Sequence, residues 1–428
     1  MDIINKKENI SSKYDILINI SKDLKDLEQH KNNCKQYYNF SNIKDFYLWI
    51  KSNKKLNNNL KIGFINNIKT EDVNNYVNLL KFYLYYKNIY ELCNKELKKF
   101  NNKLKDKTNP IIEEAINEFI RMNSDGKYIR AFLIALGYHI TNKTDDNYLP
   151  LAVAYEIFQT AILIHDDFMD EALTRRTKET ITVHYNKKYE LVENQQKNHL
   201  SNSLAICIGD LGFFYATRII SEEYKTNKNL ANILSLYSKI QMNTVKGQLL
   251  DIELPFINKY KKLDNIMDNV LEIYKYKTAW YSIIGPYLLG RSITTNESSK
   301  ITTALEKLGI AFQIKDDLLG IFQESSILGK DSNDISEFKQ TILYAYIKDN
   351  KKEYLEDLLK YYGKKALTIN DIETVRQIMT ESGAKEYAIN KMQELFKKSK
   401  QQINKTVIDK KLKDVLLGFI IYLELREN

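Results

Sequence analysis

The chain is poor in the residues that break helices, since its 428 residues include 14 Gly and only 4 Pro. So little glycine and proline leaves few places for sharp turns, and long helices are therefore favoured. Strictly alternating apolar and polar stretches, which indicate β-strands, are scarce. Apolar residues instead recur at spacings of three and four from Val73 almost to the end. We therefore predict an all-α protein.

Cysteine is also scarce, with three residues, Cys34, Cys93 and Cys207. Their odd number, wide spacing and lack of a neighbouring histidine cluster argue against a disulfide framework and against zinc. The first residues, "MDIINKKENI", have no signal-peptide core. The longest late apolar stretch, "VLLGFIIYL", is far shorter than the ~20 residues of a spanning helix. We expect a soluble, cytoplasmic protein with no transmembrane segment.

No block of one charge stands out, although the net charge is +9. The lysines are scattered among Asn, Glu and Asp rather than gathered into a basic block. A lysine-solvated surface explains this pattern better than nucleic-acid binding does. We expect no nucleic-acid partner, while small anionic substrates remain compatible with the charge.

Composition divides the chain into two predicted domains. Residues 1–88 are rich in Asn and Lys but contain "FYLWI" and "NLLKFYLYY", which are too aromatic for simple disorder. They are predicted to form a helical extension, and they carry no chemical motif. Residues 89–428 form the second domain, in which a helical pattern begins near Pro110 and continues to the C-terminus.

Two apolar segments end in aspartates. In "LIHDDFMD", Asp166 and Asp170 are four residues apart and share one helical face, with Asp167 beside them. The preceding "AYEIFQTAILIH" is apolar on nearly every side, so these carboxylates lie at the rim of a core. "FQIKDD" ends in the same way, with Asp316 and Asp317. Two such pairs predict facing carboxylate clusters that hold metal ions, and hard oxygen ligands suit Mg²⁺.

Basic residues accompany the aspartates. Lys127 and Arg130 stand in "DGKYIR", where a turn marked by glycine enters a helix, a position suited to phosphate binding. The further candidates are Arg175, Arg176, Lys277 with Thr278, Lys330 and Lys339. Each alone is more often a surface charge. Together with the aspartates they predict a site for two diphosphates, one held through Mg²⁺ and one held directly.

With these motifs in this order, residues from about 90 to 428 resemble the trans-isoprenyl diphosphate synthases, or polyprenyl synthetases. They most resemble bacterial geranylgeranyl diphosphate synthases. "DDFMD" and "FQIKDD" look like the family's two aspartate-rich motifs, and "GKYIR" looks like its isopentenyl diphosphate element. "GQLLDIEL", "YKTAW" and "LGKDSNDISEFKQTIL" match further blocks. The resemblance implies an isoprenoid synthase-type bundle of long helices around a central apolar cavity, Mg²⁺ as cofactor, and a homodimer.

The resemblance also implies roles for individual residues. Metal binding is implied for Asp166, Asp167, Asp170, Asp316 and Asp317; catalysis is implied for these together with Arg175 and Lys277. Isopentenyl diphosphate is implied to bind Lys127, Arg130, Gln159 and Arg176. The allylic diphosphate is implied to bind Arg175, Lys277, Thr278, Gln313, Lys330 and Lys339.

The chain departs from the family pattern in places. Gly320 stands where the second motif usually has a third Asp, so Asp316 and Asp317 must serve without it. Phe338 replaces a frequent Gly, and Tyr128 replaces a common Arg.

The implied reaction is condensation of isopentenyl diphosphate with an allylic diphosphate (dimethylallyl, geranyl or farnesyl) by ionisation, attack of the double bond and proton loss. Ala161 and Ile162 occupy positions where farnesyl-stopping relatives carry aromatic rings, so a farnesyl chain should pass. Phe158 lies on the four-residue stripe of Ile162 and Asp166, one turn of ~5.4 Å deeper than Ile162. It either stops growth near geranylgeranyl or is ordinary core packing.

Three other functions stay open: a longer-chain polyprenyl diphosphate synthase, a class I terpene cyclase and a non-catalytic regulatory subunit. A cyclase needs no isopentenyl diphosphate site, so Lys127 and Arg130 argue against it. A regulatory subunit typically loses an aspartate motif, whereas both motifs are present here.

Overall fold

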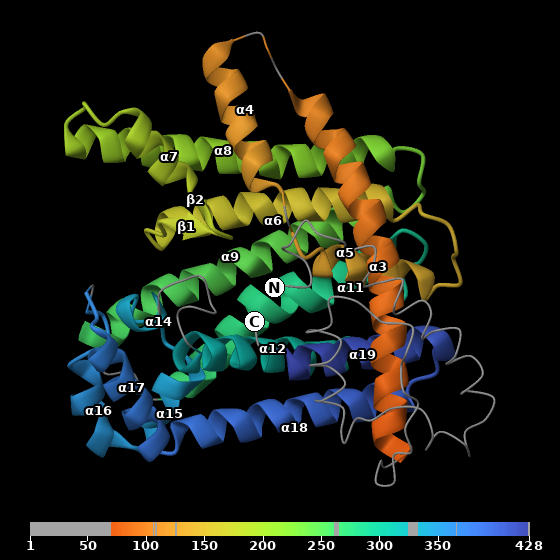
Figure 1. Cartoon of the computed structure of the whole chain (residues 1–428). Helices are drawn as coiled ribbons and strands as arrows, with labels where there is room; N and C mark the ends of the chain where they lie inside the picture. The colour runs from red at the N-terminus through yellow and green to blue at the C-terminus, as the bar shows by residue number, and fades with distance from the viewer. Residues whose placement is uncertain are drawn as a thin grey trace, which may run out of the picture. The chain divides into compact units, whose positions relative to one another are not determined.

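A computed structural model of the chain describes residues 70–105, 107, 109–124, 126–260, 265–323, 333–364 and 366–426 (Figure 1). Most of these residues lie in helices. Within the same ranges the strands are β1 (Thr174–Arg175) and β2 (Lys178–Glu179), which pair antiparallel. The predicted all-α class is confirmed.

The helices follow one another with short connections. In chain order they are α3 (Thr70–Leu104), α4 (Pro110–Met122), α5 (Ile129–His139), α6 (Leu149–Met169), α7 (Ile181–Lys188), α8 (Asn194–Glu223), α9 (Leu230–Tyr260), α10 (Ile266–Ile273), the π-helix η2 (Tyr274–Ile284), α11 (Gly285–Ser292), α12 (Thr302–Phe322), α14 (Asn333–Ser336), α15 (Ile342–Asn350), α16 (Lys352–Leu359), α17 (Ile369–Glu381), α18 (Ala384–Lys405) and α19 (Lys410–Leu425).

Helix starts follow local capping rules where the sequence provides them. Asn109 caps α4 by accepting a hydrogen bond from the Ile111 N–H, and Pro110 occupies the first turn. The helix predicted to begin near Pro110 is therefore confirmed. At α17, Thr368 and Asp371 form a reciprocal capping box.

The chain divides into two compact units. One comprises Met1–Glu91 with Phe396–Asn428, and the other comprises Leu92–Leu395. The domain boundary predicted after residue 88 lies inside α3 and stays a prediction. Residues 1–69 of the predicted extension lie outside the described residues.

In the first unit, α3 packs against α19 at close range. A Cβ added to Gly418 would lie 1.9 Å from the Asn78 carbonyl oxygen, so a residue without a side chain is required there. Beside this contact, the Phe82 ring lies 5.5 Å from the Phe419 ring and 5.2 Å from the Tyr422 ring. Aromatic packing at this distance stabilises the unit beyond simple area burial.

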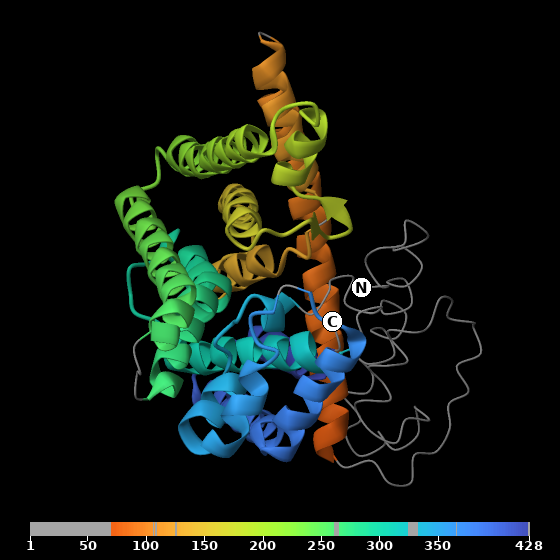
Figure 2. The same cartoon turned by 90° about the vertical axis from the view of Figure 1, so that its left-hand side faces the viewer.

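In the second unit, α6 is the central helix, and Figure 2 looks roughly along it, with α5, α8 and α9 around it. Its neighbour α8 approaches closely because Gly212 faces Ala161, where an added Cβ would lie 2.8 Å from the Ala161 Cβ. The π-helix η2 packs on α9 and α12. Site residues on α6, α9, η2 and α12 thereby face a shared region.

Among the described residues, α8 is long and apolar enough to cross a membrane by length and composition. Part of its apolar surface is in the core, as Ala205, Ile208 and Ala216 show, while Phe214 is exposed. A core helix of a soluble protein passes the same test, so this helix is weak evidence for a membrane span.

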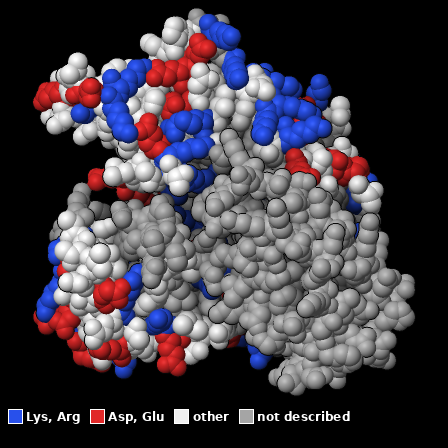
Figure 3. All heavy atoms as spheres, viewed as in Figure 1, with Lys and Arg blue, Asp and Glu red and all other residues white. Residues whose placement is uncertain are grey.

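The described surface carries both signs of charge. On the face drawn in Figure 3, Lys and Arg side chains lie among Asp and Glu side chains over the upper helices. This mixing accords with a lysine-solvated surface.

Candidate active site

Helix α6 presents the first acidic cluster, Asp166, Asp167 and Asp170, at its C-terminal end. Most of the helix is buried, but Gln159, Ile162, Leu163, Asp166 and Asp170 are partly exposed. These residues follow helical spacing and form one stripe. The predicted neighbours Phe158 and Ala161 are buried instead.

Arg175 neutralises part of this cluster. It lies on β1, and its Nε donates to Asp167 Oδ1 at 2.7 Å while its Nη2 donates to Asp166 Oδ2 at 3.3 Å. Burial opposes the charge, but Asp167 and Asp166 together raise the pKa of Arg175 above its usual value. The hairpin thus places a permanent cation beside the aspartates, as the adjacent sequence positions predicted.

Lys277 joins the same cluster from η2. Its Nζ lies 2.5 Å from Asp251 Oδ2 and 3.6 Å from Asp166 Oδ1. Burial opposes the charge on Lys277, but Asp251 and Asp166 raise its pKa. Asp251, on α9, was not among the predicted site residues, although it belongs to the block "GQLLDIEL".

The second acidic cluster, Asp316 and Asp317, lies on α12 and meets η2. Thr278 Oγ1 donates to Gln313 Oε1 at 2.5 Å, and Gln313 Nε2 donates to Asp317 Oδ1 at 2.9 Å. Tyr274 donates its hydroxyl to Asp317 and accepts from the Ile342 N–H at 2.7 Å. Thr278 and Gln313, predicted to act on one side of the site, are therefore in direct contact.

The two aspartates of this cluster differ in environment. Asp317 is 4 % exposed, and burial raises its pKa to about 7 despite the hydrogen bonds from Tyr274 and Gln313. Asp316 is partly exposed. Asp317 therefore holds the local hydrogen-bond network together, while Asp316 keeps part of its surface accessible.

Lys339 lies among carboxylates that come from distant parts of the sequence. Lys339 Nζ lies 3.5 Å from Asp170 Oδ2, 3.7 Å from Asp334 Oδ1 and 2.8 Å from Glu337 Oε2. Burial opposes its charge, but the surrounding carboxylates, Asp334 first, hold the pKa of Lys339 well above its usual value. Lys339 therefore links Asp170, the cap residue at the C-terminal end of α6, to Asp334 on α14.

Asp334 also occupies space that Gly320 leaves. A Cβ added to Gly320 would lie 2.5 Å from Asp334 Oδ2. The carboxylate of Asp334 thus approaches α12 at the position where the third aspartate of the motif was expected. Asp334 was not predicted as a site residue, because nothing in its own neighbourhood links it to position 320.

A second basic group surrounds the start of α5. Arg130 Nη2 donates to Ser282 Oγ at 2.8 Å, and its guanidinium lies 4.2 Å from the centre of the Tyr281 ring. Its Nε is buried and makes no hydrogen bond within the described part of the chain. Arg176 donates from Nη1 to the Ser124 carbonyl at 3.0 Å. Such an arrangement leaves donor capacity for an anion.

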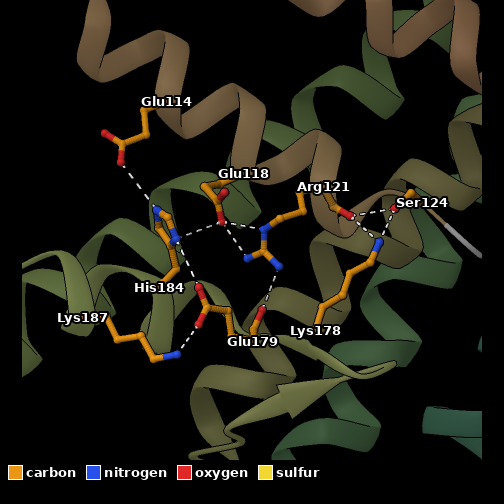
Figure 4. A network of polar contacts seen from close by, with 8 residues as sticks. All are labelled: Glu114, Glu118, Arg121, Ser124, Lys178, Glu179, His184 and Lys187. Carbon is orange, nitrogen blue, oxygen red and sulfur yellow. Dashed lines mark hydrogen bonds and ion pairs between the residues drawn. The ribbon is translucent and has the colours of Figure 1, made fainter.

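A polar network anchors the hairpin that carries Arg175 and Arg176 (Figure 4). Lys178 donates to Ser124 Oγ at 2.7 Å, and Arg121 Nη1 donates to the Glu179 carbonyl at 3.0 Å. His184 lies between Glu114 and Glu179, 3.5 Å from each. The network ties β2 and α7 to α4, and so fixes the backbone next to the two arginines.

Lys330 and Lys127 complete the predicted basic residues. Lys330 lies outside the described residues. Lys127 is partly exposed in the turn before α5. Sequence reasoning missed Asp251, Asp334 and Tyr274, each of which contacts a predicted residue across a long sequence separation.

The carboxylates of this site suit Mg²⁺. Within the described residues, no group of three or more His, Cys, Asp or Glu side chains is arranged to hold a metal ion. Mg²⁺ usually takes one or two carboxylates and completes its shell with water and substrate phosphates. The partly exposed Asp166, Asp170 and Asp316 offer oxygen ligands of this kind.

Comparison with known proteins adds the family. Residues 109–379 match the family model described as polyprenyl synthetase. The short chain isoprenyl diphosphate synthase of Methanocaldococcus jannaschii is 28% identical over 259 residues, which cover 60% of this chain and 73% of that protein. The probable farnesyl diphosphate synthase of Dictyostelium discoideum is 29% identical over 232 residues, covering 53% and 62%.

The fold is also found among solved structures. A geranylgeranyl pyrophosphate synthase from Corynebacterium glutamicum, solved with isoprenyl diphosphate and magnesium, has a TM-score of 0.70 and 23% identity. The match covers 79% of this chain and 99% of that one.

Proposed function

This chain belongs to the polyprenyl synthetase family and is a prenyltransferase, and we propose that it joins isopentenyl diphosphate to an allylic diphosphate to give all-trans geranylgeranyl diphosphate. One observation carries the proposal: Lys339 lies beside Asp170 of the first acidic cluster and beside Asp334, which approaches α12 at Gly320, while Arg130 and Arg176 form a separate cationic group. A condensation of two diphosphates needs two such sites. A reaction of one diphosphate needs only the first.

We propose Mg²⁺ as the cofactor, held by Asp166 and Asp170 from one cluster and by Asp316 from the other. When bound, Mg²⁺ polarises the allylic diphosphate as a leaving group. Asp167 has a different task, because its carboxylate is 3 % exposed and accepts from Arg175. It orients the arginine rather than presenting an oxygen to the surface.

The chain's own cations act on the allylic diphosphate. Arg175, Lys277 and Lys339 are charged, partly buried and positioned around the acidic clusters, so they offset the negative charge that develops as diphosphate departs. Because carboxylates already hold these cations in place, the cations need little rearrangement when the diphosphate leaves. Thr278 adds a hydroxyl group from the same turn of η2.

The second diphosphate, that of isopentenyl diphosphate, meets the other basic group. The buried Nε of Arg130 has unused donor capacity, and Lys127 and Arg176 lie on the neighbouring turn and hairpin. Gln159 lies on the partly exposed stripe of α6. In the sequence it comes after Arg130 and before the first acidic cluster. The apolar Ile162 and Leu163 on the same stripe would shield the carbocation from water.

We propose that Asp334 supplies the carboxylate missing at Gly320. Its Oδ2 lies 2.5 Å from the position that a Cβ on residue 320 would take, and its Oδ1 lies 3.7 Å from Lys339 Nζ. The same charge is therefore present at the second cluster, supplied from α14 rather than α12. On this proposal, the chain keeps the metal-binding capacity that the sequence departure put in doubt.

Product length depends on the apolar part of α6. Ile162 is partly exposed on the substrate stripe, while Phe158 packs edge-on to Tyr155 and Tyr237 at 5.3 Å from each ring. Ile162 carries no ring on the stripe and the buried Ala161 carries none beside it, which supports growth beyond farnesyl. Phe158 and its aromatic neighbours would form the end of the pocket. If these rings move aside, the alternative is a longer-chain polyprenyl diphosphate as the product.

Replacing Ala161 with Phe tests this pocket. Ala161 faces Gly212 on α8, so the new ring would be pushed towards the pocket or would separate the helices. We expect a shorter product together with lower thermal stability. An unchanged product distribution from folded protein would exclude the proposed pocket.

We also propose a cytoplasmic homodimer. Helix α9 exposes Met242, Val245, Leu249, Ile252 and Phe256, whose spacing alternates between three and four residues. This is the pattern of a helix seam that packs against another helix, and a second copy in twofold symmetry would supply one. Leu249→Asp should convert the dimer to a monomer in light scattering. A wild-type monomer would exclude the proposal.

The activity is tested by product analysis. Purified protein is incubated with Mg²⁺ and an allylic diphosphate, with and without isopentenyl diphosphate. We expect a longer prenyl diphosphate only when both substrates are present. A hydrocarbon formed without isopentenyl diphosphate would indicate a terpene cyclase, and no turnover except in the presence of a companion synthase would indicate a regulatory subunit.

A further inference from the structure

Glu156 is a buried carboxylate that the proposed reaction does not use. It lies on α6, is 4 % exposed, and accepts a hydrogen bond at Oε1 from the Ala131 N–H at 3.1 Å. A buried carboxylate costs several kcal/mol unless it is paired and hydrogen-bonded. Its retention in the middle of the central helix therefore requires a compensating partner.

Its first partner is the N-terminus of α5. Tyr128, the residue at the cap position, has a left-handed φ of 48° and gives no side-chain hydrogen bond to the helix. Glu156 supplies that missing acceptor from α6, and its negative charge suits the positive end of the helix. The helix that carries Arg130 thus begins where Glu156 fixes it.

Its second partners are arginines. Burial raises the pKa of Glu156, while Arg130, the Ala131 N–H and Arg176 act in the opposite direction. Burial lowers the pKa of Arg176, and the positive charges of Arg175 and Arg130 lower it further. The charge of Glu156 acts against this repulsion and raises the pKa of Arg176.

The same carboxylate also borders the turn before the helix. Its Oε2 lies 3.7 Å from the position that a Cβ on Gly126 would take. Lys127 follows Gly126 directly. One side chain therefore borders the start of the Gly126–Ala131 segment and accepts a hydrogen bond from its end, and its charge acts on Arg130 and Arg176.

We propose that Glu156 is a positioning residue for the isopentenyl diphosphate site, and this inference rests on the proposed function. A carboxylate in contact with the substrate would repel a diphosphate, so its contribution is made through Arg130, Arg176 and the turn bearing Lys127. It sets their positions before the substrate arrives. The allylic site, built on Arg175, Lys277 and Lys339, does not depend on it.

Two variants test the role. Glu156→Gln keeps an acceptor for the Ala131 N–H and removes the charge, whereas Glu156→Leu removes both. Because displacements of about 1 Å can cost on the order of 100-fold, we expect the KM for isopentenyl diphosphate to rise about tenfold in Glu156→Gln and up to ~100-fold in Glu156→Leu. The KM for the allylic substrate should stay within about twofold. Calorimetric titration with isopentenyl diphosphate alone should show the same ranking.

Asp349→Asn is a matched control. Asp349 caps α10 from α15, accepting from the Met267 N–H at 3.0 Å, and the cap residue Asn265 also has a left-handed φ, 57°. This variant loses a comparable capping carboxylate away from the arginines. It should lower thermal stability without changing the ratio of the two KM values.

The outcomes separate the inference from the proposed function. If the wild-type protein neither binds nor consumes isopentenyl diphosphate, the proposed function fails. If the wild type does so and Glu156→Gln retains its KM for isopentenyl diphosphate, or raises both KM values equally, the positioning role is wrong. Glu156→Gln keeps the test valid should Glu156→Leu fail to fold.

Discussion

Replacing Gly320 with Ala should stabilise the fold and weaken metal binding at the same time. The added Cβ would lie 2.5 Å from Asp334 Oδ2, whereas ordinary contacts begin at 3.4 Å, so the carboxylate must retreat by about 1 Å. Carboxylate oxygens bind Mg²⁺ at ~2.0–2.1 Å with a tolerance of ~0.2 Å. A shift of this size removes Asp334 from any coordination shell that it serves.

The expected changes in metal affinity and in folding stability have opposite signs. Losing a supporting or ligating group costs ~10–100-fold in metal affinity, equivalent to ~1.4–2.8 kcal/mol. Ala in place of Gly near the end of α12 should stabilise folding by up to ~1 kcal/mol, because Gly loses more chain entropy. A general packing defect would instead lower both the metal affinity and the folding stability.

The measurement is calorimetric titration of Mg²⁺ in the presence of a non-ionising allylic thiodiphosphate, alongside urea unfolding. Asp334→Asn should show the same weakening without the gain in stability. The double variant Gly320→Asp with Asp334→Gly should recover most of the affinity, since the carboxylate returns to α12. Unchanged Mg²⁺ affinity in both Gly320→Ala and Asp334→Asn would refute the compensation.

Three further changes have defined outcomes. Ile162→Phe should place a ring on the exposed stripe of α6 and shift the product to farnesyl diphosphate; an unaltered chromatographic profile would contradict this. Tyr274→Phe leaves the Ile342 N–H and the Asp317 carboxylate without this partner and should cost ~1–3 kcal/mol in urea unfolding, less in an Asp317→Asn background. Gly418→Ala brings a Cβ to 1.9 Å from a carbonyl oxygen, so overpacking should cost ~1–3 kcal/mol, and an unshifted denaturation midpoint would count against that packing.

The fold class and most of the proposed site could be predicted because their signals are local. Apolar residues at spacings of three and four predicted the helices that the described residues form. Asp166, Asp170 and Arg175 lie within one short stretch, so their proximity in space follows from their proximity in sequence.

The remaining parts depend on contacts between distant segments. Asp334 meets Gly320 only because the chain returns to α12, and Asp251 meets Lys277 only because α9 packs on η2. Helix η2 contains no glycine or proline from which its π-helical geometry could have been predicted, although π-helical turns are frequent at functional sites. The periodicity of a single sequence does not tell which of these distant segments pack together.

The depth of the pocket illustrates the limit of reading a helix by spacing. Asp166, Ile162 and Phe158 were assigned to one stripe, but each four-residue step turns ~40° beyond a full rotation, so Phe158 faces ~80° away from Asp166. The structure accordingly leaves Ile162 partly exposed and buries Phe158 among Tyr155 and Tyr237. Phe158 can then limit product length only as part of an aromatic wall, not as a single stopper.

Charge balance explains why the cations and the carboxylates of this site cannot be considered separately. Lys277 and Lys339 are held charged in a buried setting by Asp251, Asp166, Asp170 and Asp334. A divalent ion at the same aspartates would weaken that hold and make each ammonium group available to a diphosphate oxygen. Loss of either lysine should therefore weaken binding of the allylic diphosphate, because the site would lose one of the positive charges that face it.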